Sequence, residues 1–286
     1  MTDLPALRLE AEALARVLPR LFVRTKASEA VHLGSAGRRR AGTGEDFWQY
    51  RRYAQEDDAS RIDWRRSARG DTLFVRETEL ETARSIHFWL DPHAGFDWTG
   101  DVQRQTKADR ARLVMMATAN LLSREGERVG VLGGRPAGFG KRALERLYTQ
   151  LAEPLDKTPR PPRRSGTVIL ASDFYDPVDT WKRRLGPLAT KAKNGVLIAI
   201  SDPTEREFPF EGRVKLSRPG TLLEKILGRA ETVRDTYLER LDQNRDDLRA
   251  LAGDIGWRLI EHETSETPIK GAAALHAVLS EIGIPA

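Results

Sequence analysis

Three acidic residues stand directly after apolar stretches of the sequence, at places where side chains could bind a ligand. Asp91 follows HFWL, Asp173 follows VILAS and Asp202 follows LIAIS. In an open α/β sheet, ligands bind outside the carboxyl ends of the parallel strands. A single acid at such a place more often caps the next turn or helix. Three acids together strengthen the case for a binding site, and capping stays open as the structural alternative.

The first of these acids, Asp91, is followed at two-residue spacing by His93 and Gly95. Mg²⁺ requires hard oxygen ligands in near-octahedral geometry, and neither an imidazole nor a glycine side chain supplies one. We therefore expect this turn to bind Mg²⁺ poorly or not at all. Asp91, His93 and Asp173 would suit a softer divalent ion such as Mn, Fe or Zn. Together with Asp202 they leave a metal-dependent hydrolase as an alternative function.

A densely charged stretch, YRRYAQEDDASRIDWRRSARGD, occupies residues 50–71. Arginines and aspartates at this density can pair bidentately, and Ile62 with Trp64 could anchor the segment, so that an ordered network would hold it against a sheet. The same arginines and tryptophan could instead be hot spots of an interaction surface. Catalysis by Asp57, Asp58 or Asp63 is disfavoured, because no histidine, cysteine or Ser-Lys pair is near them.

The rest of the chain alternates apolar strand-like runs with helical patterns. Strands are expected at 86–90, 128–132, 167–171, 195–200 and 255–261, and helices at 107–125, 141–153, 179–193, 221–253 and 271–282. This alternation predicts an α/β fold with a mostly parallel sheet covered on both faces. An amphipathic helix with leucines at helical spacing precedes it near the N-terminus.

Composition limits the remaining possibilities. The chain has 286 residues, 40% hydrophobic and 31% charged, and no cysteine, so it can form neither a disulfide nor a thiolate metal site. We expect no signal peptide and no membrane span, and a cytoplasmic protein. The net charge of +5 comes from scattered arginine clusters. A nucleic-acid-binding protein would more often show one basic stripe with aromatic residues, and that function is kept as the less favoured alternative.

The charged stretch resembles the hallmark motif of the domain-of-unknown-function 58 family, bacterial proteins in which it precedes a von Willebrand factor A-like domain. The matching residues are Arg52, Tyr53, Asp57, Asp58, Arg61, Ile62, Asp63, Trp64, Ser67, Ala68 and Arg69, and the later Asp202, Glu205, Glu207 and Pro209 continue the likeness. The resemblance implies a Rossmann-type sheet flanked by helices. Together with the N-terminal pattern, which lies outside the resemblance, it divides the chain into three expected segments: an N-terminal helix and mobile loop (1–41), a charged motif segment packed on the main domain (42–84), and a von Willebrand A-like domain (85–286).

In von Willebrand A domains, a metal-ion-dependent adhesion site uses an Asp-x-Ser-x-Ser turn and a later aspartate. Asp91 and Asp173 match those acids, and His93 and Gly95 stand where the serines would be. The resemblance thus implies a degenerate site without a cofactor and, as partner, a MoxR-type AAA+ ATPase involved in assembly or maturation of other proteins. The expected function is a non-enzymatic protein-interaction module. Candidate partner-binding residues are Asp91, His93, Asp173, Asp202, Arg52, Asp57, Asp58, Arg61, Asp63, Trp64 and Arg69.

Overall fold

The computed structural model describes residues 3–18, 41–54, 62–68, 70, 72–79, 84–163, 165–217 and 224–282. The chain divides into two compact units, one formed by residues 1–25 together with 84–286 and the other by residues 26–83. The N-terminal helix therefore belongs to the larger unit. Each unit is described by itself.

The larger unit is built on a five-stranded parallel sheet with strand order β4-β3-β5-β6-β9. Its strands are β3 (Ser85–Leu90), β4 (Arg128–Val131), β5 (Thr167–Ser172), β6 (Asn194–Ser201) and β9 (Arg258–Glu263). The strands are short apolar runs, as expected where both faces of a parallel sheet are buried. The predicted class, a mostly parallel α/β sheet flanked by helices, is confirmed. Its von Willebrand A-like variant stays an expectation.

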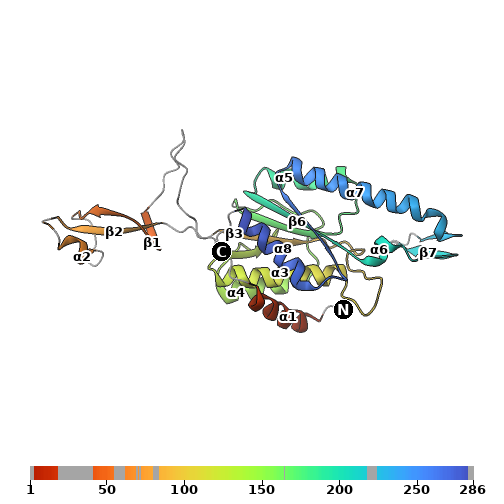
Figure 1. Ribbon diagram of the computed structural model, residues 1–286, viewed down its shortest axis with the longest axis horizontal. Helices are drawn as coiled ribbons and strands as arrows, with labels where there is room; N and C mark the ends of the chain where they lie inside the picture. The colour runs from red at the N-terminus through yellow and green to blue at the C-terminus, as the bar shows by residue number, and fades with distance from the viewer. Residues whose placement is uncertain are drawn as a thin grey trace. The chain divides into compact units, whose positions relative to one another are not determined.

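Two layers of helices cover this sheet (Figure 1). The helices are α1 (Leu4–Val17), α3 (Lys107–Arg124), α4 (Gly140–Ala152), α5 (Val178–Ala189), α6 (Pro203–Glu207), α7 (Arg234–Asp254) and α8 (Pro268–Glu281). Helices α1, α3, α4 and α8 bury one core with Ile86, Phe88 and Leu90 of β3. Helices α5 and α7 bury a second core with Trp89. Because side chains alternate along a strand, β3 contributes to both cores.

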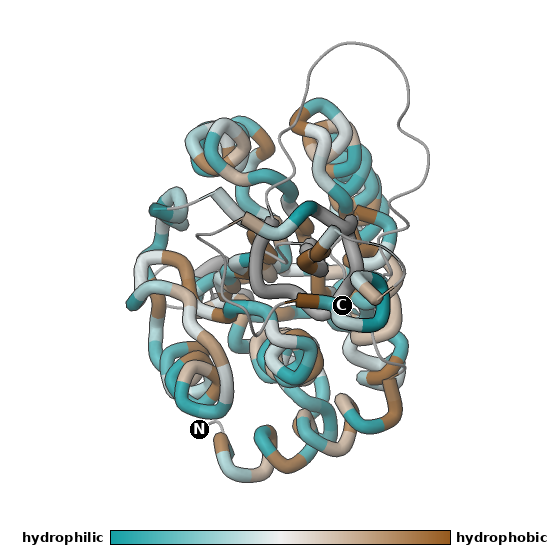
Figure 2. Tube along the Cα trace, turned by 90° about the vertical axis from the view of Figure 1, so that its left-hand side faces the viewer, coloured by the Kyte–Doolittle hydropathy of each residue, from teal (hydrophilic) through white to brown (hydrophobic). Residues whose placement is uncertain are grey.

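In Figure 2 hydrophobic and hydrophilic residues alternate along the helices. In α1, Leu7, Ala11 and Ala15 are buried, and Asp3 caps the helix by accepting a hydrogen bond from the backbone N–H of Ala6. This four-residue repeat places one face of α1 against the core. Among the described residues, none of the helices is both long and apolar enough to cross a membrane.

One expected helix begins later than the sequence predicts. Residues 221–253 were expected to be helical, whereas β8 (Glu224–Leu227) pairs antiparallel with β7 (Val214–Ser217), a short 3₁₀ turn follows at Ala230–Val233, and α7 begins only at Arg234. The prediction for 224–233 was therefore wrong, and residues 221–223 lie outside the described residues. The charged composition of this stretch fits an exposed hairpin as well as an exposed helix.

The smaller unit contains an antiparallel pair of strands, β1 (Ala41–Arg52) and β2 (Phe74–Glu79), with the short helix α2 (Trp64–Ser67) between them in sequence. Ile62 forms an isolated bridge with Val75, and both side chains are buried. The hydroxyl of Ser67 accepts a hydrogen bond from the backbone N–H of Phe74 at 2.9 Å. These contacts fix α2 on β2.

Candidate functional site

The three strand-end acids lie at the same edge of the sheet. Asp91 follows β3, Asp173 follows β5 and Asp202 follows β6, three neighbouring parallel strands. All three are buried. The predicted gathering of acids at the carboxyl edge is therefore present, and the question is what their carboxylates contact.

The carboxylate of Asp91 is engaged within the chain. Its Oδ2 accepts a hydrogen bond of 2.6 Å from the hydroxyl of Ser172, and its Oδ1 accepts one of 3.0 Å from the backbone N–H of His93. Burial raises the pKa of Asp91, and these two hydrogen bonds oppose that rise only in part. The imidazole of His93 lies over Gly95, where a Cβ would come within 2.5 Å of the ring. Glycine at 95 thus makes room for His93.

Asp173 forms an ion pair with Lys107, the first residue of α3. The ammonium Nζ lies 2.9 Å from Oδ2 of Asp173 and 2.5 Å from Oε1 of Glu205, and Lys107 is only 1% exposed. It also lies 4.9 Å from the ring centre of Tyr175. Burial acts to lower the pKa of Lys107, but the two carboxylates outweigh it and the pKa is raised. Lys107 is therefore a fixed cation inside the acidic edge, by which we mean the carboxyl edge of the sheet at Asp91, Asp173 and Asp202.

Glu205 connects this cation to the third acid. Its Oε2 accepts hydrogen bonds from the backbone N–H of Asp202 at 2.9 Å and from the hydroxyl of Tyr175 at 2.8 Å. The first of these, with the hydrogen bond that the Asp202 side chain accepts from the backbone N–H of Glu205, forms the capping box of α6. The backbone N–H of Thr204 also donates to Asp202, at 2.9 Å. Burial and the contact with Glu205 raise the pKa of Tyr175, so this hydroxyl stays a donor.

Asp202 has further partners on its other side. Its Oδ2 accepts hydrogen bonds from the hydroxyls of Thr99 at 3.2 Å and Thr264 at 3.0 Å, and its Oδ1 lies 3.3 Å from Nη2 of Arg104. Burial alone would raise the pKa of Asp202, but the hydrogen bonds from Thr204 and Thr264 stabilise the carboxylate and the pKa is lowered. The ionised carboxylate of Asp202 thus connects the start of α6 with the loop that carries Thr99 and Arg104 and with the turn that carries Thr264.

These residues do not fit a divalent metal ion. A metal at Asp173 and Glu205 would have to displace the Lys107 ammonium or lie next to it, and like charges at such distances repel. Within the described part of the chain, no three His, Cys, Asp or Glu residues are grouped so that they could hold a metal. His93 contributes its backbone N–H to Asp91, and its ring packs on Gly95.

In the smaller unit, the structure assigns local roles to part of the charged motif. Asp63 caps α2 by accepting a hydrogen bond of 3.0 Å from the backbone N–H of Arg66. Arg52 is exposed at the end of β1. Four further candidates, Asp57, Asp58, Arg61 and Arg69, lie outside the described residues.

Within the smaller unit, Trp64 does not serve as the expected apolar anchor. Trp64 is 64% exposed, whereas Ile62 and Val75 are buried. Trp64 is the first residue of α2, directly after its cap Asp63, and at that position its side chain extends into solvent. The apolar anchor of the segment is the pair formed by Ile62 and Val75.

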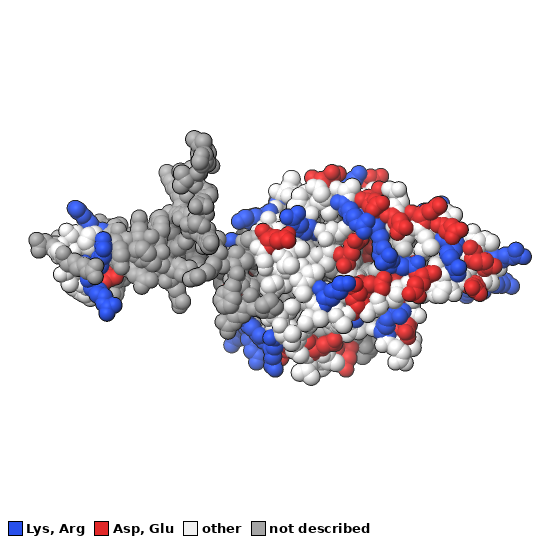
Figure 3. Space-filling view, in the orientation of Figure 1, with Lys and Arg blue, Asp and Glu red and all other residues white. Residues whose placement is uncertain are grey.

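Sequence reasoning missed the residues that engage the acids: Lys107, Glu205, Tyr175, Arg104, Thr99 and Thr264. One signal was available, because Asp202 and Glu205 have the spacing of a capping box. Nothing in the sequence around Lys107 shows that its side chain turns inward. On the face of the larger unit seen in Figure 3, basic and acidic side chains are interspersed, without the single basic stripe of a nucleic-acid-binding surface.

Comparison with known proteins places these features in a family. The family model described as "Protein of unknown function DUF58" matches residues 49–247. Uncharacterized proteins of Mycobacterium tuberculosis and Mycobacterium bovis are each 28% identical over 247 residues, which cover 78% of this chain and 76% of the relative. An uncharacterized protein of Mycobacterium avium is 33% identical over 108 residues, 37% of this chain and 62% of that protein.

Among solved structures, the PilB minor pilin from Streptococcus sanguinis matches with a TM-score of 0.34 and 11% sequence identity. The match covers 73% of this chain and 64% of the pilin, so less than two thirds of the pilin is spanned. At that TM-score the likeness carries no argument about fold or function.

Proposed function

Because the chain belongs to the DUF58 family of proteins of unknown function, we propose from its own residues that it is a non-enzymatic protein-interaction module. The observation that carries this proposal is the exposure of Trp64 on a short helix that also presents Arg65 to solvent. Tryptophan and arginine are the residue types most enriched among interface hot spots. An exposed tryptophan held by a capped and anchored helix is already positioned to bind.

The acidic edge of the sheet supports the same proposal. A hydrolase that used Asp91, Asp173 and Asp202 would need their carboxylates to face a metal ion or an attacking water. Instead Asp91 accepts from Ser172, and Asp173 is paired with Lys107. A carboxylate held by a buried ammonium is a poor general base, because the ion pair stabilises its charged form. The contacts of these acids favour a structural role.

The partner implied by the family resemblance is a MoxR-type AAA+ ATPase, and we propose it as the protein that this module engages in assembling or maturing other proteins. The sequence suggested the acidic edge, together with His93, as a surface that binds the partner. Since the acids of that edge are paired within the chain, we place the contact on Trp64 and Arg65. Binding by these residues requires no metal ion.

The test is the affinity of the chain for a purified MoxR-type ATPase from the same organism, measured by biolayer interferometry. Trp64→Ala should weaken binding about thirtyfold or more, since hot-spot truncations cost about 2 kcal/mol or more. The matched control is Val102→Ala, another exposed apolar residue, in the larger unit. Binding that is unaffected by Trp64→Ala would place the contact elsewhere, and binding abolished by EDTA would contradict a metal-independent module.

A further inference from the structure

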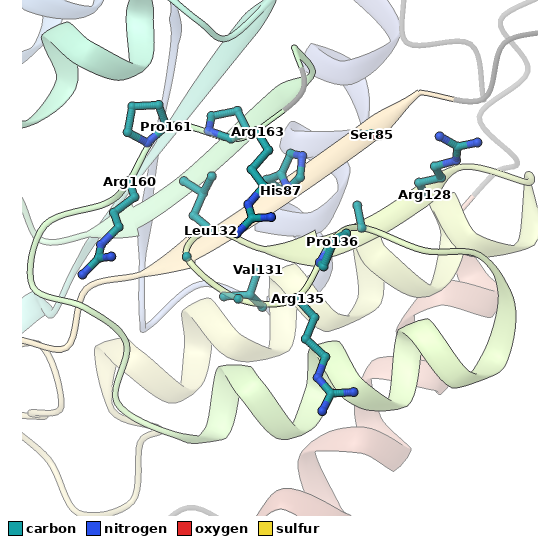
Figure 4. A pocket seen from close by; sticks show the side chains of 14 residues that line it. Ser85, His87, Arg128, Val131, Leu132, Arg135, Pro136, Arg160, Pro161 and Arg163 are labelled. Atoms are coloured by element: carbon teal, nitrogen blue, oxygen red, sulfur yellow. The ribbon is translucent and has the colours of Figure 1, made fainter.

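A pocket of about 570 Å³ lies beside β3 and β4, away from the acidic edge. One wall is the turn that follows β4, with Arg135 and Pro136, and the other is the proline-rich loop, with Arg160, Pro161 and Arg163 (Figure 4). The volume suits a small molecule, since ligand pockets commonly enclose about 300 to 1,000 Å³. None of the contacts described for the acidic edge uses it.

Two features of the sequence create this space. Gly130 of β4 pairs with His87 of β3, and it has no side chain to fill the neighbouring volume. A Cβ at Gly130 would also come within 2.9 Å of the Cα of Ala137, so glycine lets the turn after β4 fold back closely. The opposite wall is fixed by a hydrogen bond of 3.0 Å from Nε1 of Trp89 to the backbone carbonyl of Asp156. The pocket is therefore built into the framework of the sheet.

His87 lines this pocket with a buried and unsatisfied polar atom. The residue is 8% exposed, and its Nε2 has no hydrogen-bond partner among the described residues. Buried polar atoms are nearly always hydrogen-bonded, so an exception needs an explanation such as a missing ligand atom. Burial lowers the pKa of His87, which keeps the imidazole neutral in the free protein.

Four arginines line the same space. Arg128 and Arg135 come from β4 and its following turn, and Arg160 and Arg163 come from the proline-rich loop. In Figure 4 Arg163 extends towards His87, whereas the guanidinium groups of Arg128, Arg135 and Arg160 point away from the middle of the pocket. Arg160 pairs with Asp156 at 3.1 Å. Within the described part of the chain, Arg135 and Arg163 enter no ion pair.

We propose that this pocket binds a small organic phosphate, with the phosphate held by Arg163 and its neighbours and by Nε2 of His87, and the organic part against Leu132, Pro136 and Pro161. Arginine binds phosphate with strong, often bidentate hydrogen bonds. A guanidinium directed at the pocket favours a dianionic phosphate over a singly charged carboxylate, because the attraction grows with the charge of the ligand. The volume of about 570 Å³ suits a small molecule.

Phenyl phosphate is the probe, because it joins a dianion to a small apolar body. It is titrated into the full chain by calorimetry, and in parallel by NMR of the imidazoles, of which the chain has five. The His87 resonances are assigned from the His87→Gln variant. We expect saturable binding with a Kd of about 1 mM or tighter and shifts at His87. Inorganic phosphate, benzoate and benzyl alcohol should each bind more weakly.

Arg163→Gln should weaken phenyl phosphate binding about tenfold, as loss of a charge-assisted contact does. Arg142→Gln, an exposed arginine on α4 outside the pocket, should change it less than about twofold. The proposal is overturned if binding is not saturable, if His87 does not respond, or if the two variants behave alike. Benzoate binding as tightly as phenyl phosphate would overturn the phosphate class, and a tighter-binding oligothymidylate would overturn the small-molecule site.

Discussion

The ammonium of Lys107 lies 2.9 Å from a carboxylate oxygen of Asp173, and the side chains are only 1% and 7% exposed. This ion pair joins the first residue of α3 to the end of β5, and Glu205 extends it to α6. The edge of the sheet that was expected to present free acids therefore contains its own cation. The positive charge among these acids is thus supplied by the side chain of Lys107.

Replacing Lys107 with methionine should destabilise the protein strongly. Methionine keeps much of the side-chain volume but removes the charge, which leaves Asp173 and Glu205 buried without their cation. Breaking a buried ion pair from one side costs about 3 to 5 kcal/mol. The measurement is the free energy of unfolding in urea at neutral pH. We expect a lower midpoint with an unchanged slope.

The control for this experiment is Lys141→Met. Lys141 is exposed, and its Nζ lies 4.0 Å from Glu145 on the surface of α4. Such a pair contributes less than about 1 kcal/mol. If Lys107→Met and Lys141→Met lose similar stability, then the Lys107 pair is solvated and the role given to it here is wrong.

The sheet was predictable from the sequence, and the partners of its acids were not. Apolar runs such as VILAS at 168–172 bury both faces, and helices of ordinary length separate them, so class and strand positions follow from local pattern. The partner of Asp173 is 66 residues away along the chain. Lysine in the first turn of a helix is normally solvated, and only the packing of the whole domain buries Lys107.

The role of Trp64 shows a second limit of sequence reasoning. Ile62 and Trp64 are both apolar and two positions apart, and from composition alone both could anchor the segment. The structure separates them, because Ile62 lies in an extended bridge to Val75 whereas Trp64 begins a helix after the cap Asp63. The direction of the side chains changes where the extended backbone gives way to the helix, and residue type alone does not predict that change.

Trp64→Ala should lower the free energy of unfolding by less than about 1 kcal/mol, since substitutions of exposed side chains usually have small effects. Ile62→Ala should lower it by about 2 to 5 kcal/mol, because it empties a buried site against Val75. Both variants are compared with the parent by urea unfolding, followed by a probe in the smaller unit. A larger loss for Trp64→Ala than for Ile62→Ala would show that Trp64 is covered after all.

Stability should fall as the pH drops through about 6.5, the ordinary pKa of histidine. Nε2 of His262 lies 3.1 Å from Nη1 of Arg110 and Nδ1 lies 3.0 Å from Glu266, an arrangement that suits a neutral ring accepting from the arginine. Burial, with Arg110, lowers the pKa of His262. Below the ordinary value the unfolded chain therefore binds more protons than the folded one, and protonation favours unfolding.

His262→Gln should flatten this dependence between pH 7.5 and about 5.5, the range over which histidines of ordinary pKa are protonated. Part of the pH dependence of stability should remain, because burial also lowers the pKa of His87. A slope that is equally steep with and without His262 would contradict the assignment of a neutral buried ring.

The last prediction concerns metal ions at the acidic edge. Mg²⁺ at millimolar concentration should give no saturable heat with the parent chain, because the Lys107 ammonium already lies 2.9 Å from Asp173 and 2.5 Å from Glu205 and would repel a second cation. Calorimetry with Mg²⁺, Mn²⁺ and Zn²⁺ is the measurement, and Asp173→Asn is the matched variant. Saturable Mg²⁺ binding that disappears in Asp173→Asn would show that the ammonium can be displaced. Zn²⁺ or Mn²⁺ binding with the same dependence would instead favour the hydrolase alternative.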